Sequence, residues 1–271
     1  MTNTNIPLGT PEPRIITGIN TIGVMTLVNK EVGRFLNVYL QTIIAPVITT
    51  LLFYAIFALA FGGIAREVGG VPYMQFLAPG LVMMTMVQNA FANTSSSIVI
   101  SKVQGNIVDV LMPPLGPLEI LAGYLSGGIL RGLCVGLATT IVISFFVEPG
   151  LHSVFYILVF AVLGTMMLSM MGICGGIWSE KFDHIAAVTN FFVTPLTFLS
   201  GTFYAIESLP PVWQSIALYN PFYHMIDGFR YGFIGHDDAF PFIGALFLLG
   251  INVALGLLVY WMLKTGYKIK S

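Results

Sequence analysis

The chain has 271 residues, of which 56% are hydrophobic and only 8% are charged, and its mean hydropathy is +0.87. Soluble domains carry roughly 25% charged residues, so this composition excludes a soluble protein and indicates an integral membrane protein. The formal net charge of -1 leaves no basic face to neutralise phosphates, which excludes nucleic acid as a partner.

The apolar tracts predict an all-α protein with six transmembrane helices, because a helix needs about 20 apolar residues to cross a bilayer. The predicted spans are approximately Ile43–Phe61, Tyr73–Ile98, Ile120–Val147, Val154–Trp178, His184–Tyr204 and Phe240–Leu263. Among the basic residues outside the spans, one side holds Arg66 and Arg230, whereas the side with both termini holds Arg14, Lys30, Arg34, Lys102, Lys181, Lys264, Lys268 and Lys270. Basic residues favour the cytoplasmic side, so we expect both termini to be cytoplasmic.

Two different segments precede the first span. Residues 1–16 are rich in proline and are predicted to form a flexible cytoplasmic tail before the membrane domain, 17–271. In residues 21–41, polar side chains recur every three or four positions opposite an apolar stripe, namely at Lys30, Arg34, Asn37 and Gln41. This pattern predicts an amphipathic helix in the headgroup plane, with a plain extension of the first span as the alternative.

A charged, proline-broken stretch, residues 101–119, separates the second and third spans. Helix breakers are few before Pro113 and Pro114, so we expect one or two helical turns at about 104–112. The candidate contact residues of this short helix are Gln104, Asn106, Ile107, Val108, Asp109 and Leu111. Its three apolar members are spaced to share one outward face that fits a partner's groove. An ordinary connecting loop is the alternative.

The third predicted span combines a charge with a row of small residues. Arg131 costs about 2.5 to 3.5 kcal/mol at a helix centre, so we expect it to face protein, water or headgroups. It either makes a cytoplasmic-side contact that helps transmit motion or meets an anionic group, or it extends to the membrane surface. Close packing of the third span on the fourth is predicted by the glycines Gly123, Gly127, Gly128, Gly132 and Gly136, and by Gly172 and Gly176.

The break before the sixth span, residues 205–238, is too apolar for a free loop. Prolines divide it, and its aromatic side chains are of the kind that settle at a membrane interface, so two re-entrant helices are predicted. His224 and Asp227 have no third ligand at a fixed spacing, so we expect no metal site there.

Several catalytic signatures are missing from the chain. It contains no G-x-x-x-x-G-K-[ST], H-E-x-x-H or G-x-S-x-G motif, and no Gly-Lys dipeptide. The spans also lack the charges that ion-coupled carriers need. We therefore expect no catalytic residue, no bound cofactor and no ATP hydrolysis by this chain alone.

Several stretches together resemble one family: Tyr73–Met84 (YMQFLAPGLVMM), Gly105–Pro113 with Gly116–Tyr124, Arg131–Leu133, and Ser200–Gly235. Through them the chain is identified as a member of the ABC-2 type transport permeases, most similar to the YadH-type inner-membrane permeases. The resemblance covers nearly the whole chain. It implies a permease of the bacterial inner membrane that works as a dimer, with two copies of a separate P-loop ATPase subunit that bind ATP and Mg²⁺.

By the same resemblance, Gln104–Met112 is the coupling helix on the ATPase, and the amphipathic helix contributes Lys30 and Arg34 to that contact. The family often has a basic residue where this chain has Gly105, so the charge contact would fall to Lys102. Spans one, two and five then line the pathway, with candidate substrate contacts at Asn89, Asn93, Asn190, Thr194 and Thr197. The re-entrant helices form an extracytoplasmic cap, with candidate residues Trp213, Asn220, Pro221, His224, Asp227 and Arg230.

These observations predict the transmembrane subunit of an ATP-binding cassette exporter. It would move an amphipathic substrate, such as a lipid, a lipid-linked glycan or a hydrophobic drug, outward by alternating access while surrounded by membrane lipids. The alternative is a membrane scaffold or assembly factor that binds a cytoplasmic partner without transport.

Overall fold

The computed structural model describes residues 18–61, 67–68, 70–148, 150–235 and 240–269. Within these ranges the regular structure is helical apart from one antiparallel pair of two-residue strands, β1 (Glu67–Val68) and β2 (Val71–Pro72). The predicted tail, 1–16, lies outside the described residues. The all-helical class is therefore confirmed.

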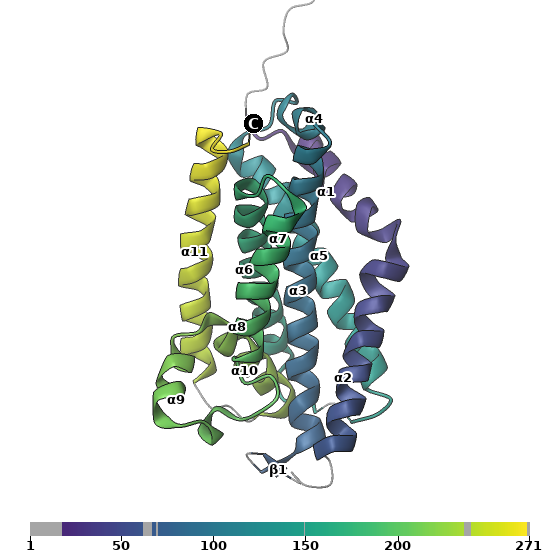
Figure 1. The fold of residues 1–271 in the computed structure, drawn as a ribbon, viewed down its shortest axis with the longest axis vertical. Coiled ribbons are helices and arrows are strands. Elements are labelled where there is room, and N and C mark those ends of the chain that lie inside the picture. Colours follow the sequence, from purple (N-terminus) through teal and green to yellow (C-terminus); the bar gives the residue numbers. More distant parts are fainter. Residues whose placement is uncertain (1–17, 62–66, 69, 149, 236–239, 270–271) are drawn as a thin grey trace, which may run out of the picture.

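The helices run in a long bundle (Figure 1), and their bounds differ from the predicted spans at several ends. In chain order they are α1 (Thr21–Leu36), the π-helix η1 (Leu40–Ile44), α2 (Ala45–Phe61), α3 (Tyr73–Val103), α4 (Ile107–Leu111), α5 (Pro117–Ile143), α6 (Val154–Trp178), α7 (Phe182–Val188), the π-helix η2 (Thr189–Val193), α8 (Thr194–Phe198), the 3-10 helix η3 (Ile206–Ser208), α9 (Pro211–Leu218), α10 (Pro221–Ile234) and α11 (Pro241–Thr265).

Four segments of the described chain are long and apolar enough to cross a membrane, namely Leu40–Ala60, α5, α6 and α11. The 31-residue α3 is longer than these helices, but its second half carries many amide and hydroxyl side chains. The stretch from α7 to α8 is shorter and contains η2. The integral membrane class is thus confirmed, whereas the count of six spans and the re-entrant helices stay predictions.

The second predicted span, α3, is the central helix of the bundle and packs against α2, α5, α6 and α10 (Figure 1). Glycines on its neighbours allow this close approach. A Cβ added at Gly132 of α5 would lie 3.0 Å from the carbonyl oxygen of Met86, and one at Gly172 of α6 would lie 2.6 Å from that of Phe91. The glycines that were predicted to pack span three on span four therefore also allow close contact with the backbone of α3.

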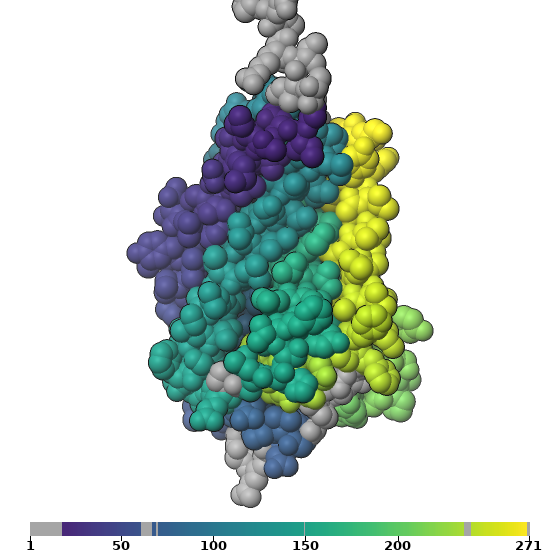
Figure 2. Space-filling model, turned by 180° about the vertical axis from the view of Figure 1, so that it is seen from behind, coloured from purple at the N-terminus to yellow at the C-terminus, as the bar shows by residue number. Residues whose placement is uncertain are grey.

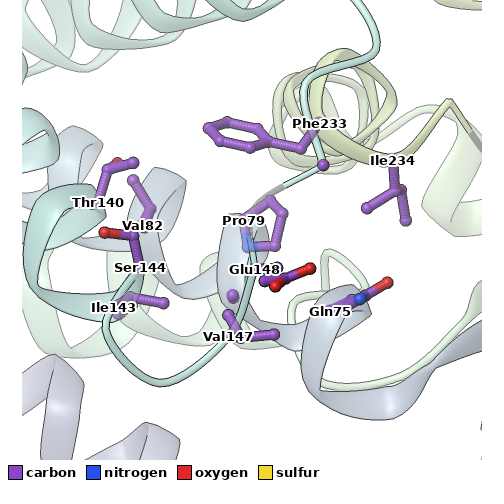
Figure 3. Close-up of a pocket in the computed structure, with 12 residues that line it drawn as sticks. Gln75, Pro79, Val82, Thr140, Ile143, Ser144, Val147, Glu148, Phe233 and Ile234 are labelled. Carbon is purple, nitrogen blue, oxygen red and sulfur yellow. The ribbon is translucent and has the colours of Figure 1, made fainter.

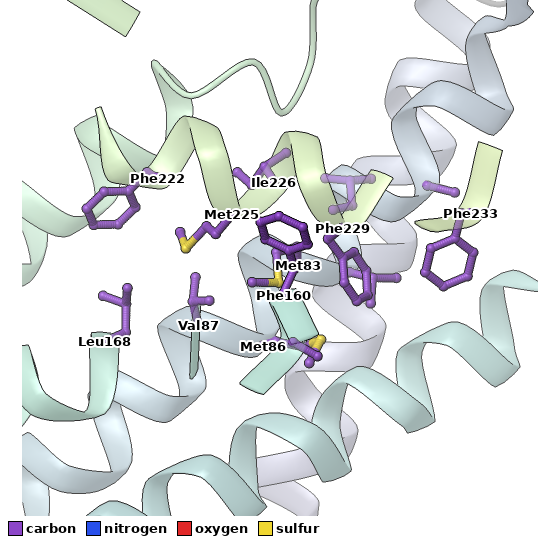
Figure 4. Packing of buried hydrophobic residues seen from close by; sticks show 14 of the residues in the cluster. Met83, Met86, Val87, Phe160, Leu168, Phe222, Met225, Ile226, Phe229 and Phe233 are labelled. Carbon is purple, nitrogen blue, oxygen red and sulfur yellow. The ribbon is translucent and has the colours of Figure 1, made fainter. Parts of the chain in front are cut away.

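The largest apolar core lies where α10 crosses α3 and α6 (Figure 4). Side chains of α10 such as Met225 and Phe229 point toward Met83 of α3 and Phe160 of α6. The ring of Phe160 rests directly on Gly228, where an added Cβ would lie 2.1 Å from Phe160 Cζ. The last helix before α11 is thus a buried part of the bundle and not only a surface cover.

The opposite face of the molecule is dominated by α5 (Figure 2). Its teal surface crosses the face diagonally, between the purple α1 and the yellow α11. The glycine row of α5 also receives α1, because a Cβ at Gly123 would lie 2.5 Å from Leu27 Cδ2. The amphipathic helix α1 is therefore packed against the bundle along its buried side.

Two π-helical turns interrupt the described helices. In η1 the hydroxyl of Thr42 donates to the carbonyl oxygen of Phe35 at 2.6 Å, and Pro46 follows at the start of α2. In the second, η2, the chain likewise approaches a proline, Pro195 of α8. Proline lacks an amide hydrogen and crowds the carbonyl four residues earlier, so a widened turn fits before it.

Candidate functional site

The connection between α3 and α5 projects from the end of the molecule where α1 begins and α11 ends (Figure 1). After α3 the chain turns at Gly105, whose φ of +76° favours glycine. This geometry gives a local reason for glycine at this position. α4 follows and ends before Pro113 and Pro114, so a short helix is present within the predicted range.

The orientation of α4 differs from the prediction. Ile107 and Leu111 pack toward the bundle beside the buried Val110, whereas 51% of Val108 and 74% of Met112 is exposed. The prediction of one outward face shared by Ile107, Val108 and Leu111 is therefore wrong for Ile107 and Leu111. The outward side chains of this end include Val103, Gln104, Asn106, Val108, Asp109 and Met112.

The start of α1 is hydrogen-bonded to the C-terminal part of the connection between α3 and α5 and to the first turn of α5. Asn20 caps α1 by accepting from the amide of Gly23 at 3.0 Å, and its side-chain nitrogen donates to the carbonyl oxygen of Pro114 at 3.3 Å. The carboxylate of Glu119 accepts from the amides of Asn20 and Gly116. We name the segment Val103–Gly116 the handle, and these contacts brace it against α1.

The side-chain amine of Lys102 is hydrogen-bonded within the protein. It donates to the carbonyl oxygens of Ile177 and Ser179, at 2.7 and 2.6 Å, at the C-terminal end of α6. A cation suits a helix C-terminus, so the structure corrects the expectation that Lys102 supplies the partner's charge contact.

A buried polar cluster joins α1 to α3 at the same end of the bundle. Glu31 is fully buried, and its carboxylate accepts from the hydroxyl of Ser97 at 2.6 Å and pairs with Arg34 at 3.2 Å. Arg34 also donates to the main-chain and side-chain oxygens of Asn93, at 2.6 and 2.8 Å. We name Glu31, Arg34, Asn93 and Ser97 the polar cluster.

The polar cluster corrects two predictions at once. Arg34, expected to contact the ATPase, and Asn93, expected to contact substrate, are bonded to each other inside the protein. Lys30 lies on the exposed side of α1 and is the one of the two predicted basic residues that faces outward. The prediction did not include Glu31, although an acidic side chain within one turn of two cations is a signal for a pair.

A groove of about 320 Å³ opens between the first predicted span and α3. Phe53 and Leu81 line its end nearer the start of α3, whereas Thr50 and Thr85 in its middle lie 2.6 Å apart between their hydroxyl oxygens. The polar side chains along the groove are Gln41, Thr49, Thr50, Thr85, Gln88 and Asn89. The groove is thus amphipathic, and Asn89 is one of its lining residues, while its role in a substrate pathway stays a prediction.

Arg131 approaches this groove from behind Asn89. Only 9% of the residue is exposed, and its Nη2 donates to Asn89 Oδ1 at 2.9 Å. Its Nε is buried and has no hydrogen-bond partner in the described part of the chain. The guanidinium therefore faces protein and the groove wall, in agreement with the expectation that it avoids the lipid.

The remaining pathway candidates come from the stretch that includes η2 and α8. Asn190 is exposed and Thr194 is half-buried. Thr197 is fully buried and donates to the carbonyl oxygen of Val193 at 2.6 Å. Thr197 is therefore corrected from a pathway residue to an internal helix contact.

Arg230 is the most buried cation of the described chain. Its Nη2 donates to the carbonyl oxygen of Gly201 at 2.6 Å, and its guanidinium lies 3.7 Å from the ring centre of Phe76. Asp227, one turn earlier on α10, is 3% exposed. These two predicted cap residues thus lie inside the bundle, and Arg230 joins α10 to α3 and to the segment after α8.

The other predicted cap residues shape the turn between α9 and α10. Asn220 caps α10 by accepting from the amide of Phe222 at 3.0 Å, and Pro221 occupies the first turn. The Nε2 of His224 lies 2.8 Å from the carbonyl oxygen of Leu218. Trp213 lines an apolar hollow of about 310 Å³ beside α8. Across the described residues, no group of three potential ligands is placed to hold a metal ion.

A third, much smaller cavity lies between α3, the end of α5 and α10 (Figure 3). Its volume is about 20 Å³, which is enough for roughly one water molecule. Pro79, Val82 and Phe233 line it with Gln75 and Glu148. A cavity of this size is a packing defect and not a substrate site.

Comparisons with known proteins agree with this architecture. A family model described as ABC-2 type transporter matches residues 23–234. The inner membrane transport permease YadH of Escherichia coli strain K12 is 39% identical over 243 residues, which cover 89% of this chain and 94% of that protein. The chain therefore belongs to the ABC-2 type transporter family, as its motifs predicted.

More distant relatives share part of the chain. Nodulation protein J of Rhizobium leguminosarum bv. trifolii is 25% identical over 189 residues, or 68% of this chain and 72% of that protein. The capsule polysaccharide export inner-membrane protein BexB of Haemophilus influenzae is 32% identical over 117 residues, or 43% of this chain and 44% of that protein. The family membership thus rests on the YadH alignment and the family model.

Proposed function

We propose that this chain is the transmembrane permease subunit of an ATP-binding cassette exporter in the bacterial inner membrane. It crosses the membrane six times, with α3 and the α7–α8 stretch as the second and fifth spans and with both termini in the cytoplasm. Two copies pair, and each docks on a separate P-loop ATPase subunit that binds ATP and Mg²⁺. The chain itself supplies no step of ATP hydrolysis.

The handle is the observation that carries this proposal. It presents Val108 and Met112 outward at the end where α1 begins, and apolar surface gains about 25 cal/mol per Å² when a partner covers it. The handle continues directly from α3, the central helix. A protein that pulls on the handle therefore acts on the helix that contacts most of the bundle.

The groove supports an amphipathic substrate. Its polar residues and its apolar end lie along one opening between the first span and α3, which suits a molecule with a polar head and a hydrocarbon part. BexB is named as a capsule polysaccharide export protein, which supports the outward direction for the present chain.

The proposal is tested by co-expressing the permease with a soluble P-loop ATPase of the same organism and purifying the complex. We expect Val108→Asp and Met112→Asp, alone and together, to weaken co-purification and ATPase stimulation, because each places a charge in an apolar contact and loss of an interface hot spot costs about 2 kcal/mol or more. Leu151→Asp is the matched control, since this exposed leucine lies outside the handle. The permease alone should hydrolyse no ATP.

Normal assembly and stimulation in the Val108→Asp, Met112→Asp double variant would show that the handle is an ordinary loop. A complex that forms through the handle but transfers no lipid in vesicles supplied with ATP would favour the scaffold function.

A further inference from the structure

Arg131 is a buried cation without a carboxylate partner in the described chain. The ion pairs in its half of the bundle join Glu31 to Lys30 and Arg34. One buried carboxylate thus serves a region with three cations, and a buried charge is costly unless it is paired.

The hydrogen bonds of Arg131 leave most of its donors unused. A guanidinium has five N–H donors in a planar fork. The bond to Asn89 Oδ1 at 2.9 Å uses one of them, and the buried Nε has no partner among the described residues. Such a fork matches the two oxygens of a phosphate or carboxylate group.

The groove places this fork beside a space for a ligand. Asn89 lines the groove and is the side chain that Arg131 contacts. Gln41, Gln88 and Asn89 lie at the cytoplasmic-side end, because α2 begins and α3 ends on that side, whereas Phe53 and Leu81 lie nearer the extracytoplasmic end. The groove is thus polar at its cytoplasmic-side end and apolar at its other end. A lipid of the inner leaflet, with its head toward the cytoplasm, has its polar and apolar parts in the same order.

We propose that Arg131 and Asn89 form the headgroup subsite for an anionic amphiphile, in which Arg131 binds a phosphate or carboxylate and the groove holds the hydrocarbon chain. This inference rests on the proposed function, for which it names the substrate class. The anion supplies the countercharge that the protein lacks. The cost of burying Arg131 in the empty permease is thereby recovered as binding free energy when substrate enters.

The test uses the purified full-length permease without any ATPase, so its result is independent of handle docking. Native mass spectrometry measures retention of phosphatidylglycerol against phosphatidylcholine, and thermal unfolding is recorded with and without each lipid. We expect the parent to retain phosphatidylglycerol in preference to phosphatidylcholine. Arg131→Gln should bind phosphatidylglycerol at least about tenfold more weakly, because charge-assisted hydrogen bonds are lost. Arg131→Lys should restore part of the retention, since it keeps the charge but not the fork.

Lys264→Gln is the matched control, because it removes a cation at the end of α11, away from the groove. It should retain phosphatidylglycerol as the parent does. Stability separates a ligand site from a structural role: without lipid, Arg131→Gln should unfold at the parent's temperature or higher, and phosphatidylglycerol should stabilise the parent only. A merely structural arginine would instead lower the unfolding temperature in the lipid-free state.

Equal retention by the parent and Arg131→Gln, or equal retention of the two lipids by the parent, would overturn the proposal. Displacement of phosphatidylglycerol by millimolar inorganic phosphate would identify a site for a free anion and would overturn the proposal that the ligand is an amphiphile. Failure of these tests leaves the exporter function intact, and failure of handle docking leaves the lipid subsite intact.

Discussion

Replacement of Glu31 by alanine removes the carboxylate of the polar cluster. The fully buried Glu31 pairs with Arg34 at 3.2 Å and accepts from Ser97 at 2.6 Å. Loss of one partner of a buried pair costs about 3 to 5 kcal/mol. The Arg34 side chain is 27% exposed, so water compensates part of its charge, and we expect Glu31→Ala to lower the free energy of unfolding by about 2 to 4 kcal/mol.

Equilibrium unfolding by SDS in mixed micelles measures this loss. Glu31→Gln should cost less, because the amide oxygen still accepts from Ser97 while the charge is removed. Glu207→Ala is the control: Glu207 is exposed, and its loss should change stability by no more than about 0.5 kcal/mol. The double variant Glu31→Ala, Arg34→Ala should be less destabilised than the sum of the single variants.

Two results would refute this reasoning. One is a Glu31→Ala variant as stable as the Glu207→Ala control, which would mean that the carboxylate contributes nothing. The other is strict additivity of Glu31→Ala and Arg34→Ala, which would show that the two side chains do not interact although they lie 3.2 Å apart.

Two further predictions concern topology and the buried arginine of α10. In a background without the native cysteines, an impermeant thiol reagent added to intact cells should label Ser208→Cys and not Met112→Cys; the reverse labelling would invert the proposed orientation. Arg230→Met should cost about 3 kcal/mol or more in the same SDS assay, because the bond to Gly201 and the stack on Phe76 are lost. A cost below about 1 kcal/mol would show that these contacts are not stabilising.

Local sequence signals predicted the elements better than their surroundings. Prolines mark the end of α4 and the starts of α5, α9, α10 and α11, because proline stops a helix behind it and fits the first turn of a helix ahead of it. The length of the apolar tracts likewise predicted the membrane class, because it too is a property of consecutive residues. These features depend on neighbouring residues, which the sequence shows directly.

Tertiary contacts decide the features that were missed. Glu31 becomes buried because Gly127 of α5 has no side chain. A Cβ added at Gly127 would lie only 2.5 Å from the Cβ of Glu31. The inward turn of Ile107 and Leu111 follows from packing of α4 on its own bundle, whereas periodicity fixes only which residues share a face. The sequence pattern therefore located the site elements and could not assign their inward and outward sides.

The π turns η1 and η2 have a consequence for movement. Each accommodates an extra residue, and one residue of an α-helix corresponds to about 100° of rotation around the axis. Rewinding η1 as an α turn would rotate the face of α2 that now carries Thr50 against Thr85. A screw rotation of α2, with α1 and the handle held still, would therefore change which of its side chains line the groove without tilting α2.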